Sequence, residues 1–154
     1  MKRLFFLLTL SFLVLSCGGS DDICESGEGT PRMKVSFKNG DKLTTLDSLK
    51  VYVDLGNSTV DLGWKTNAES ILVPLRVDNA PYTEMYIKTG NKQDSSKVRV
   101  TYNTKTQYVS PGCGVKMNYT DLNGELLIPN SVIKIENGQN FIENEEKTNL
   151  YLIF

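Results

Sequence analysis

Tyr108-Val-Ser-Pro-Gly-Cys-Gly-Val-Lys-Met-Asn-Tyr119 alternates regularly over its second half. From Cys113 onward, Cys113, Val115, Met117 and Tyr119 share one side, and small or polar residues share the other. Alternation with a period of two predicts a β-strand with one face on the core. The same period points the sulfur of Cys113 into the core, where a cysteine from a distant part of the chain can reach it.

Similar segments lie before and after this stretch, and turns rich in Gly and Asn separate them. Their apolar residues alternate, and no window keeps the helical period over ten residues, which predicts an all-β chain. Pro74 interrupts one of them and indicates an edge strand. The segments cover residues 33–37, 49–55, 71–77, 85–87, 98–102, 113–119, 126–128, 132–135 and 150–154.

About eight short strands at this spacing predict a single-domain antiparallel β-sandwich over residues 30–154, immunoglobulin-like or similar, with one disulfide. Asn123-Gly124 is predicted to be a hairpin turn between two of the strands. Val60-Asp-Leu-Gly63 echoes Val53-Asp-Leu-Gly56 and is interpreted as a strand end followed by a turn. That interpretation places Trp64 in or near a loop.

The first residues are typical of an export signal. Met1-Lys-Arg3 is basic, and an apolar run reaches Leu15, which predicts a signal peptide over residues 1–16. Val14-Leu-Ser-Cys17 resembles a bacterial lipobox, so Cys17 is expected to carry lipid and to attach the protein to a membrane. The alternative is an ordinary secretory signal that leaves Cys17 as a free thiol. Residues 17–29, rich in Gly, Ser and acidic residues, are expected to form a flexible tether.

The chain has three cysteines. If Cys17 carries lipid, only Cys24 and Cys113 remain, and an oxidising compartment favours a disulfide between them. The alternative is two unpaired thiols.

A set of short segments occurs in a characteristic order along the chain: Asp21-Asp-Ile-Cys24, Thr30-Pro31, Ser70-Ile71, Pro74-Leu75, Thr101-Tyr102, Tyr108-Val-Ser110, Cys113-Gly114, Asn118-Tyr119, Asn137 and Ile142-Glu-Asn144. Taken together, these segments resemble an uncharacterised lipoprotein family of the Bacteroidota, domain of unknown function 6452. The resemblance implies a secreted lipoprotein of unknown role, and we expect it at the outer membrane, periplasmic or surface-exposed. The chain departs from the family at Gly112, where alanine is common, and at Asn149, where histidine is common.

Composition argues against most chemistries. There is no histidine, so neither Ser-His nor Cys-His catalysis is available, and zinc lacks ligands. Asp121, Asn123 and Glu125 resemble the start of a calcium loop, but a hairpin turn explains them better. The remaining glutamates of the last third lie in polar surroundings that do not favour a raised pKa. We therefore expect no enzyme, no metal and no cofactor, and a net charge of −1 argues against nucleic acid.

Aromatic residues are the candidate contact residues. Trp64, Tyr82, Tyr86 and Tyr108 are candidates for contact with a ligand or partner, although a single tryptophan is more often part of a core. Asp47-Ser48-Leu49 fits a short O-glycosylation motif at Ser48, which is also frequent by chance. The sequence thus favours a non-catalytic protein-interaction or assembly accessory module of the envelope. The alternative is a module that binds a glycan or another small ligand.

Overall fold

The alternating segments form ten β-strands in the computed structural model, which describes residues 29–90 and 94–154. This part of the chain contains no helix, so the prediction of an all-β chain is confirmed. The strands are β1 (Met33–Asn39), β2 (Lys42–Leu43), β3 (Leu49–Asp54), β4 (Thr59–Lys65), β5 (Ser70–Val73), β6 (Tyr82–Thr89), β7 (Ser96–Ser110), β8 (Gly114–Ile128), β9 (Lys134–Asn137) and β10 (Thr148–Ile153).

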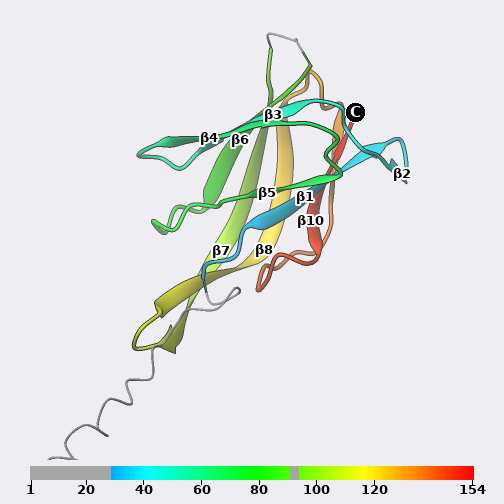
Figure 1. Cartoon of the computed structure of the whole chain (residues 1–154). Coiled ribbons are helices and arrows are strands. Elements are labelled where there is room, and N and C mark those ends of the chain that lie inside the picture. The colour runs from blue at the N-terminus through cyan, green and yellow to red at the C-terminus, as the bar shows by residue number, and fades with distance from the viewer. Residues whose placement is uncertain (1–28, 91–93) are drawn as a thin grey trace, which may run out of the picture.

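The strands form two sheets (Figure 1). The first has the order β2-β1-β10-β9, with β5 also paired to β1, and the second has the order β4-β3-β6-β7-β8. Among the described strands β5 pairs with β1 alone, so it is an edge strand as predicted, and Pro74 directly follows its last residue, Val73. Strands β1 and β10 run parallel, so the prediction of a purely antiparallel fold is wrong at this pair. A parallel pair needs a long connection, and almost the whole chain lies between these two strands.

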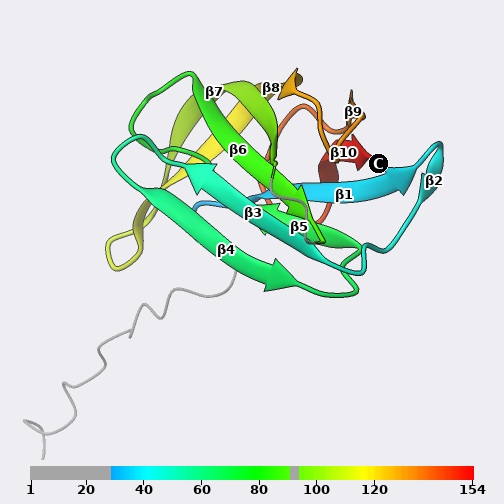
Figure 2. The ribbon, with the colours of Figure 1, turned by 90° about the horizontal axis from the view of Figure 1, so that it is seen from above.

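The inner faces of the two sheets share one hydrophobic core. Figure 2 shows the sheets as two layers, with β4, β3 and β6 on one side and β1 and β10 on the other. The predicted alternation places the buried residues: Met33, Val35 and Phe37 of β1 face the core, and so do the odd-numbered residues of β3. Phe154 closes one end of this core by packing edge-on against Phe37, with 6.0 Å between ring centroids.

The stretch around Cys113 differs from the prediction. Cys113 lies half-buried in the turn between β7 and β8, and not in a strand that faces the core. The side that carries Val115, Met117 and Tyr119 does alternate as expected, but only Tyr119 is fully buried, and Val115 is 61% exposed. The reason is length, because β7 and β8 continue well past the edge of the core as a two-stranded ribbon (Figure 1). We call residues 103–120 the ribbon.

Asn123-Gly124 is not the predicted turn, since it lies inside the continuous strand β8. Asp121 has a φ of 56°, and the β7–β8 register shifts beside it, so a β-bulge absorbs one extra residue. Gly124 leaves room for packing, because a Cβ there would lie 2.6 Å from Cδ1 of Leu150, which would have to shift. A glycine selected by close approach therefore resembles a turn glycine in the sequence.

Val60-Asp-Leu-Gly63 is likewise strand and not turn, because it lies within β4. Gly63 has a φ of 71°, and the β3–β4 register shifts opposite it, which is again the pattern of a bulge. Trp64 follows the bulge in the edge strand of the second sheet, one residue before β4 ends at Lys65, so it lies near a loop, as predicted, but within a strand. It is half exposed and does not belong to the core.

Candidate functional site

Aromatic side chains and cations cover the outer face of the second sheet. Because side chains alternate along a strand, the even-numbered residues of β3 and β6 point away from the core. The register places Tyr52 directly opposite Tyr86, with Trp64 opposite Lys50 at the β4 edge. We call this surface the aromatic face: Lys50, Tyr52, Asp61, Trp64, Tyr82, Glu84, Tyr86, Lys97 and Arg99.

Lys50 organises the β4 side of the aromatic face. Its ammonium lies 4.8 Å from the ring centroid of Tyr52 and 5.9 Å from that of Trp64, within cation–π range. It also pairs with Asp61 at 3.0 Å. Hydrogen bonds with Tyr52 and then with Asp61 raise the pKa of Lys50, so it stays charged. The ring of Trp64 therefore lies next to a fixed positive charge.

Glu84 organises the β6–β7 side. Its carboxylate accepts from Arg99 at 2.7 Å and pairs with Lys97 at 2.8 Å. Each cation also contacts a tyrosine: the guanidinium of Arg99 lies 4.7 Å from the Tyr82 ring centroid, and the ammonium of Lys97 lies 5.4 Å from that of Tyr86. Burial acts to raise the pKa of Glu84, but hydrogen bonds from Lys97 and Arg99 outweigh it and hold the pKa below the ordinary value.

This arrangement predicts a loss of stability in acid. The folded-state pKa of Glu84 lies below its ordinary value of 4.5, so the unfolded chain binds more protons there, and the contribution is complete only above that pH. It is lost as the pH falls through the folded-state pKa. The midpoint temperature of thermal unfolding should therefore fall more steeply with decreasing pH, below about pH 4.5, in the native protein than in Glu84→Gln. Parallel curves for the two proteins would contradict the assignment.

A cleft of about 520 Å³ opens beside Trp64, at the edge where β4 and β5 lie. Among the described strands, β4 pairs only with β3, and β5 pairs only with β1, so both present an unpaired backbone edge. Leu62, Ile71 and Leu72 supply apolar surface to the cleft, while Arg32 and Lys65 supply positive charge. The cleft can accommodate an extended chain or a flat ring against the indole.

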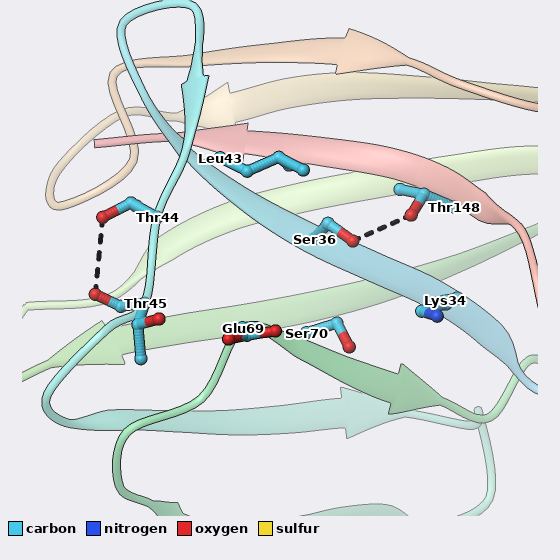
Figure 3. Close-up of a pocket in the computed structure, with 8 residues that line it drawn as sticks. All are labelled: Lys34, Ser36, Leu43, Thr44, Thr45, Glu69, Ser70 and Thr148. Atoms are coloured by element: carbon cyan, nitrogen blue, oxygen red, sulfur yellow. Dashed lines mark hydrogen bonds between the residues drawn. The ribbon is translucent and has the colours of Figure 1, made fainter.

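A second cleft, of about 560 Å³, lies over the outer face of the first sheet (Figure 3). Ser36 of β1 and Thr148 of β10 share a hydrogen bond of 2.8 Å on one side of it. Ser70 and Glu69 line it from β5 and the residue before it. The cleft is rich in hydroxyl groups and contains no aromatic ring, so it suits water better than a stacked sugar.

The predicted contact residues divide into two groups. Tyr82, Tyr86 and Trp64 come together on the aromatic face, although Trp64 is separated from the two tyrosines by β3. Tyr108 lies elsewhere, exposed near the tip of the ribbon. Lys50 and Tyr52 were missed as site residues. Their even-numbered positions in the alternating segment 49–55 were the signal that could have identified them.

Of the remaining predicted sites, Cys17 and Cys24 lie outside the described residues, whereas Cys113 and Ser48 are described. Cys113 is disulfide-bonded. The pairing with Cys24 stays a prediction. Ser48 lies half-buried just before β3, and its carbonyl accepts a hydrogen bond from the amide of Gly90, which does not test O-glycosylation.

Four of the side chains that the sequence offers for acid–base chemistry or calcium take part in structural hydrogen bonds. Asp121 accepts a hydrogen bond from Asn103, and Asn123 accepts one from Asn137, so both are tied to neighbouring strands. Hydrogen bonds from Lys38 lower the pKa of Glu136, and the one from Arg32 lowers the pKa of Glu145. Within the described ranges, no group of three or more acidic or cysteine side chains is placed to hold a metal ion.

Comparison with known proteins identifies one relationship. Residues 48–154 match the model of a protein family whose function is unknown. Neither a curated protein nor a solved structure matches the chain. Over residues 29–90 and 94–154 there is no helix of the length and hydrophobicity needed to cross a membrane.

Proposed function

The chain belongs to the family of unknown function DUF6452, and we propose that it is a non-catalytic protein-interaction module of the cell envelope. The observation that carries the proposal is the position of Trp64, half exposed beside the fixed charge of Lys50 and at an open strand edge. Exposed tryptophans next to cations are typical centres of protein interfaces. An unpaired edge also offers backbone hydrogen bonds to an added strand.

Two features favour a partner protein over a small ligand. The tyrosines of the aromatic face lie on an extended sheet surface, and the clefts border that surface or lie on the other sheet. The face also carries both signs of charge, with Lys50 and Arg99 beside Asp61 and Glu84, which suits a partner of matched charge pattern. Its cations are already paired within the sheet, so little reorganisation is needed on binding.

Trp64→Ala is the first test. The variant should lose partner binding by about 30-fold, the fold-change of roughly 2 kcal/mol at an aromatic hot spot. Its own unfolding should change little, because the indole is half exposed. The measurement is quantitative crosslinking in intact cells, with a photoreactive residue placed at Lys65 of the same strand.

Val77→Ala serves as the matched control, since Val77 is an exposed apolar residue that lies outside the aromatic face. It should leave the crosslinked yield unchanged. Equal yields from native protein and Trp64→Ala would exclude the β4 edge as the interface.

The proposal includes a location. A signal peptide over residues 1–16 and lipid on Cys17 would attach the protein to the outer membrane, periplasmic or surface-exposed. A disulfide between Cys24 and Cys113 would join the tether to the turn of the ribbon, and the disulfide-bonded state of Cys113 supports this pairing. Two sheets over one core support classification as a β-sandwich.

Cys17→Ala tests the anchor. The variant should move from the membrane fraction to the soluble fraction, because no acyl chain would then hold it. Fractionation with immunodetection measures this, and mass spectrometry of the native protein should show a lipid-modified Cys17. A variant that stays fully membrane-bound would contradict lipid anchoring at this residue.

The non-catalytic assignment has its own test. Glu136 and Glu145 are held ionised by Lys38 and Arg32, the opposite of what a general acid needs. The purified protein should turn over no glycan, peptide or ester substrate. Hydrolysis that a single glutamate substitution abolishes would overturn the assignment.

Glycan binding is the second candidate, and the cleft beside Trp64 is the observation that favours it. An indole can stack on the face of a sugar ring. If the ligand is a glycan, Trp64→Ala should again abolish binding. In contrast to a protein partner, a purified glycan should bind the isolated native protein directly. Titration of envelope glycans, followed by the fluorescence of Trp64, separates the two candidates.

A further inference from the structure

The ribbon ends in an apolar pair that the fold leaves uncovered. Tyr108 and Val115 are directly opposite each other in the β7–β8 register. Tyr108 is 65% exposed and Val115 is 61% exposed. They continue the stripe that begins in the core with Tyr119 and passes through Met117, so both point to the same side of the ribbon. Lys105 of β7 is exposed three positions before Tyr108, on the opposite side of the ribbon.

The start of the described chain lies along this ribbon. The amide of Met117 donates a hydrogen bond of 3.1 Å to Oγ1 of Thr30. Cys113, in the turn at the tip, is disulfide-bonded. Thr30, next to the first residue that the structure describes, therefore lies on the ribbon side of the fold.

Chain length then limits how far the tip can move from an anchor at Cys17. If Cys24 is the partner of Cys113, seven residue steps separate Cys17 from Cys24. A fully extended chain of that length spans at most about 25 Å. Without the disulfide, the twelve steps from Cys17 to Gly29 would allow about 40 Å. Such a disulfide would hold the tip closer to the membrane than the tether alone requires.

We propose that the tip of the ribbon, formed by Tyr108 and Val115, contacts the headgroup region of the membrane that carries the lipid anchor. The inference rests on the proposed lipid anchor and on the Cys24–Cys113 pairing. A tyrosine ring suits this depth, with its apolar body toward the acyl chains and its hydroxyl in water. Lys105 adds attraction to anionic headgroups.

The contact fixes the orientation of the fold. The other end of β8, at Ile128, lies fourteen residues from Gly114, or roughly 45 Å at the rise of a strand. The loop with Ile133 follows that end and would face away from the membrane (Figure 1). The tip contact is thus a second membrane signal, of the kind that makes lipid anchoring stable.

Depth-dependent fluorescence quenching tests the contact. Mature full-length lipoprotein is reconstituted in vesicles of phosphatidylethanolamine and phosphatidylglycerol that carry brominated acyl chains. Trp64→Phe removes the only tryptophan of the chain. In that background Tyr108→Trp reports the tip, and Val115→Trp reports it independently should one of them fold poorly. Ile133→Trp is the matched control, because Ile133 is 64% exposed.

We expect roughly twofold stronger quenching at positions 108 and 115 than at 133, since an interfacial ring lies at the headgroup level. Reduction of the disulfide should narrow this difference, and a difference that survives reduction would overturn the role of the disulfide. Equal quenching in protein that floats with the vesicles would overturn the tip contact and leave the anchor intact. Protein that does not float with the vesicles would overturn the anchor and the tip contact together.

Discussion

Replacement of Tyr119 by alanine is expected to lower the free energy of unfolding by about 4 kcal/mol, the usual cost of emptying a large aromatic site. Tyr119 is fully buried where the ribbon joins the core. Its ring packs edge-on against Tyr102 of the paired strand, with 5.1 Å between ring centroids. A cavity here would remove the support that holds the two-stranded ribbon to the body. Equilibrium unfolding in urea measures the change.

Tyr119→Phe is the matched control. The hydroxyl donates only weakly, at 3.5 Å to the carbonyl of Leu75 and 3.4 Å to that of Arg76. Burial raises the pKa of Tyr119, so the hydroxyl stays protonated in any working buffer. Its loss should cost about 1 kcal/mol or less. Similar losses for the alanine and phenylalanine variants would show that the hydroxyl, and not the ring, holds this junction.

Asn149→Ala is expected to cost about 3 kcal/mol, because it strands buried polar groups without partners. Asn149 is 4% exposed. Its Oδ1 accepts from the amide of Lys34 at 3.1 Å, and its Nδ2 donates to the carbonyls of Gln139 and Phe141, both at 3.0 Å. One side chain thus joins β1, β10 and the loop before β10. Thermal or urea unfolding measures the loss.

Two variants sharpen this prediction. Asn149→Asp keeps the acceptor for Lys34 but points oxygen at two carbonyls, so it should be at least as destabilising as alanine. Asn57→Ala, at an exposed turn, should be nearly neutral. A mild effect of Asn149→Asp would mean that the two donated bonds matter little. The role of Asn149 is structural, because one buried side chain joins three segments of the first sheet and its loop.

The sequence by itself determined the strands and their inner faces. Met33, Val35 and Phe37 are buried where alternation placed them, because a period of two is a local property of the extended backbone. Pro74 marked an edge for an equally local reason, since it has no amide proton to donate. The aromatic face was half foreseen: Tyr82 and Tyr86 follow from alternation, whereas their cationic neighbours do not.

Tertiary structure alone decided how far the core extends, which strands pair and what each glycine does. Val115 follows the same alternation as Tyr119 but lies beyond the end of the opposing sheet, so one is exposed and the other buried. Gly63 and Gly124 resemble turn glycines, yet one shapes a bulge and the other makes room for Leu150. The contacts of Lys50 with Trp64 and of Arg99 with Tyr82 depend on strand order and register. Those are set by the packing of distant segments, which no local period encodes.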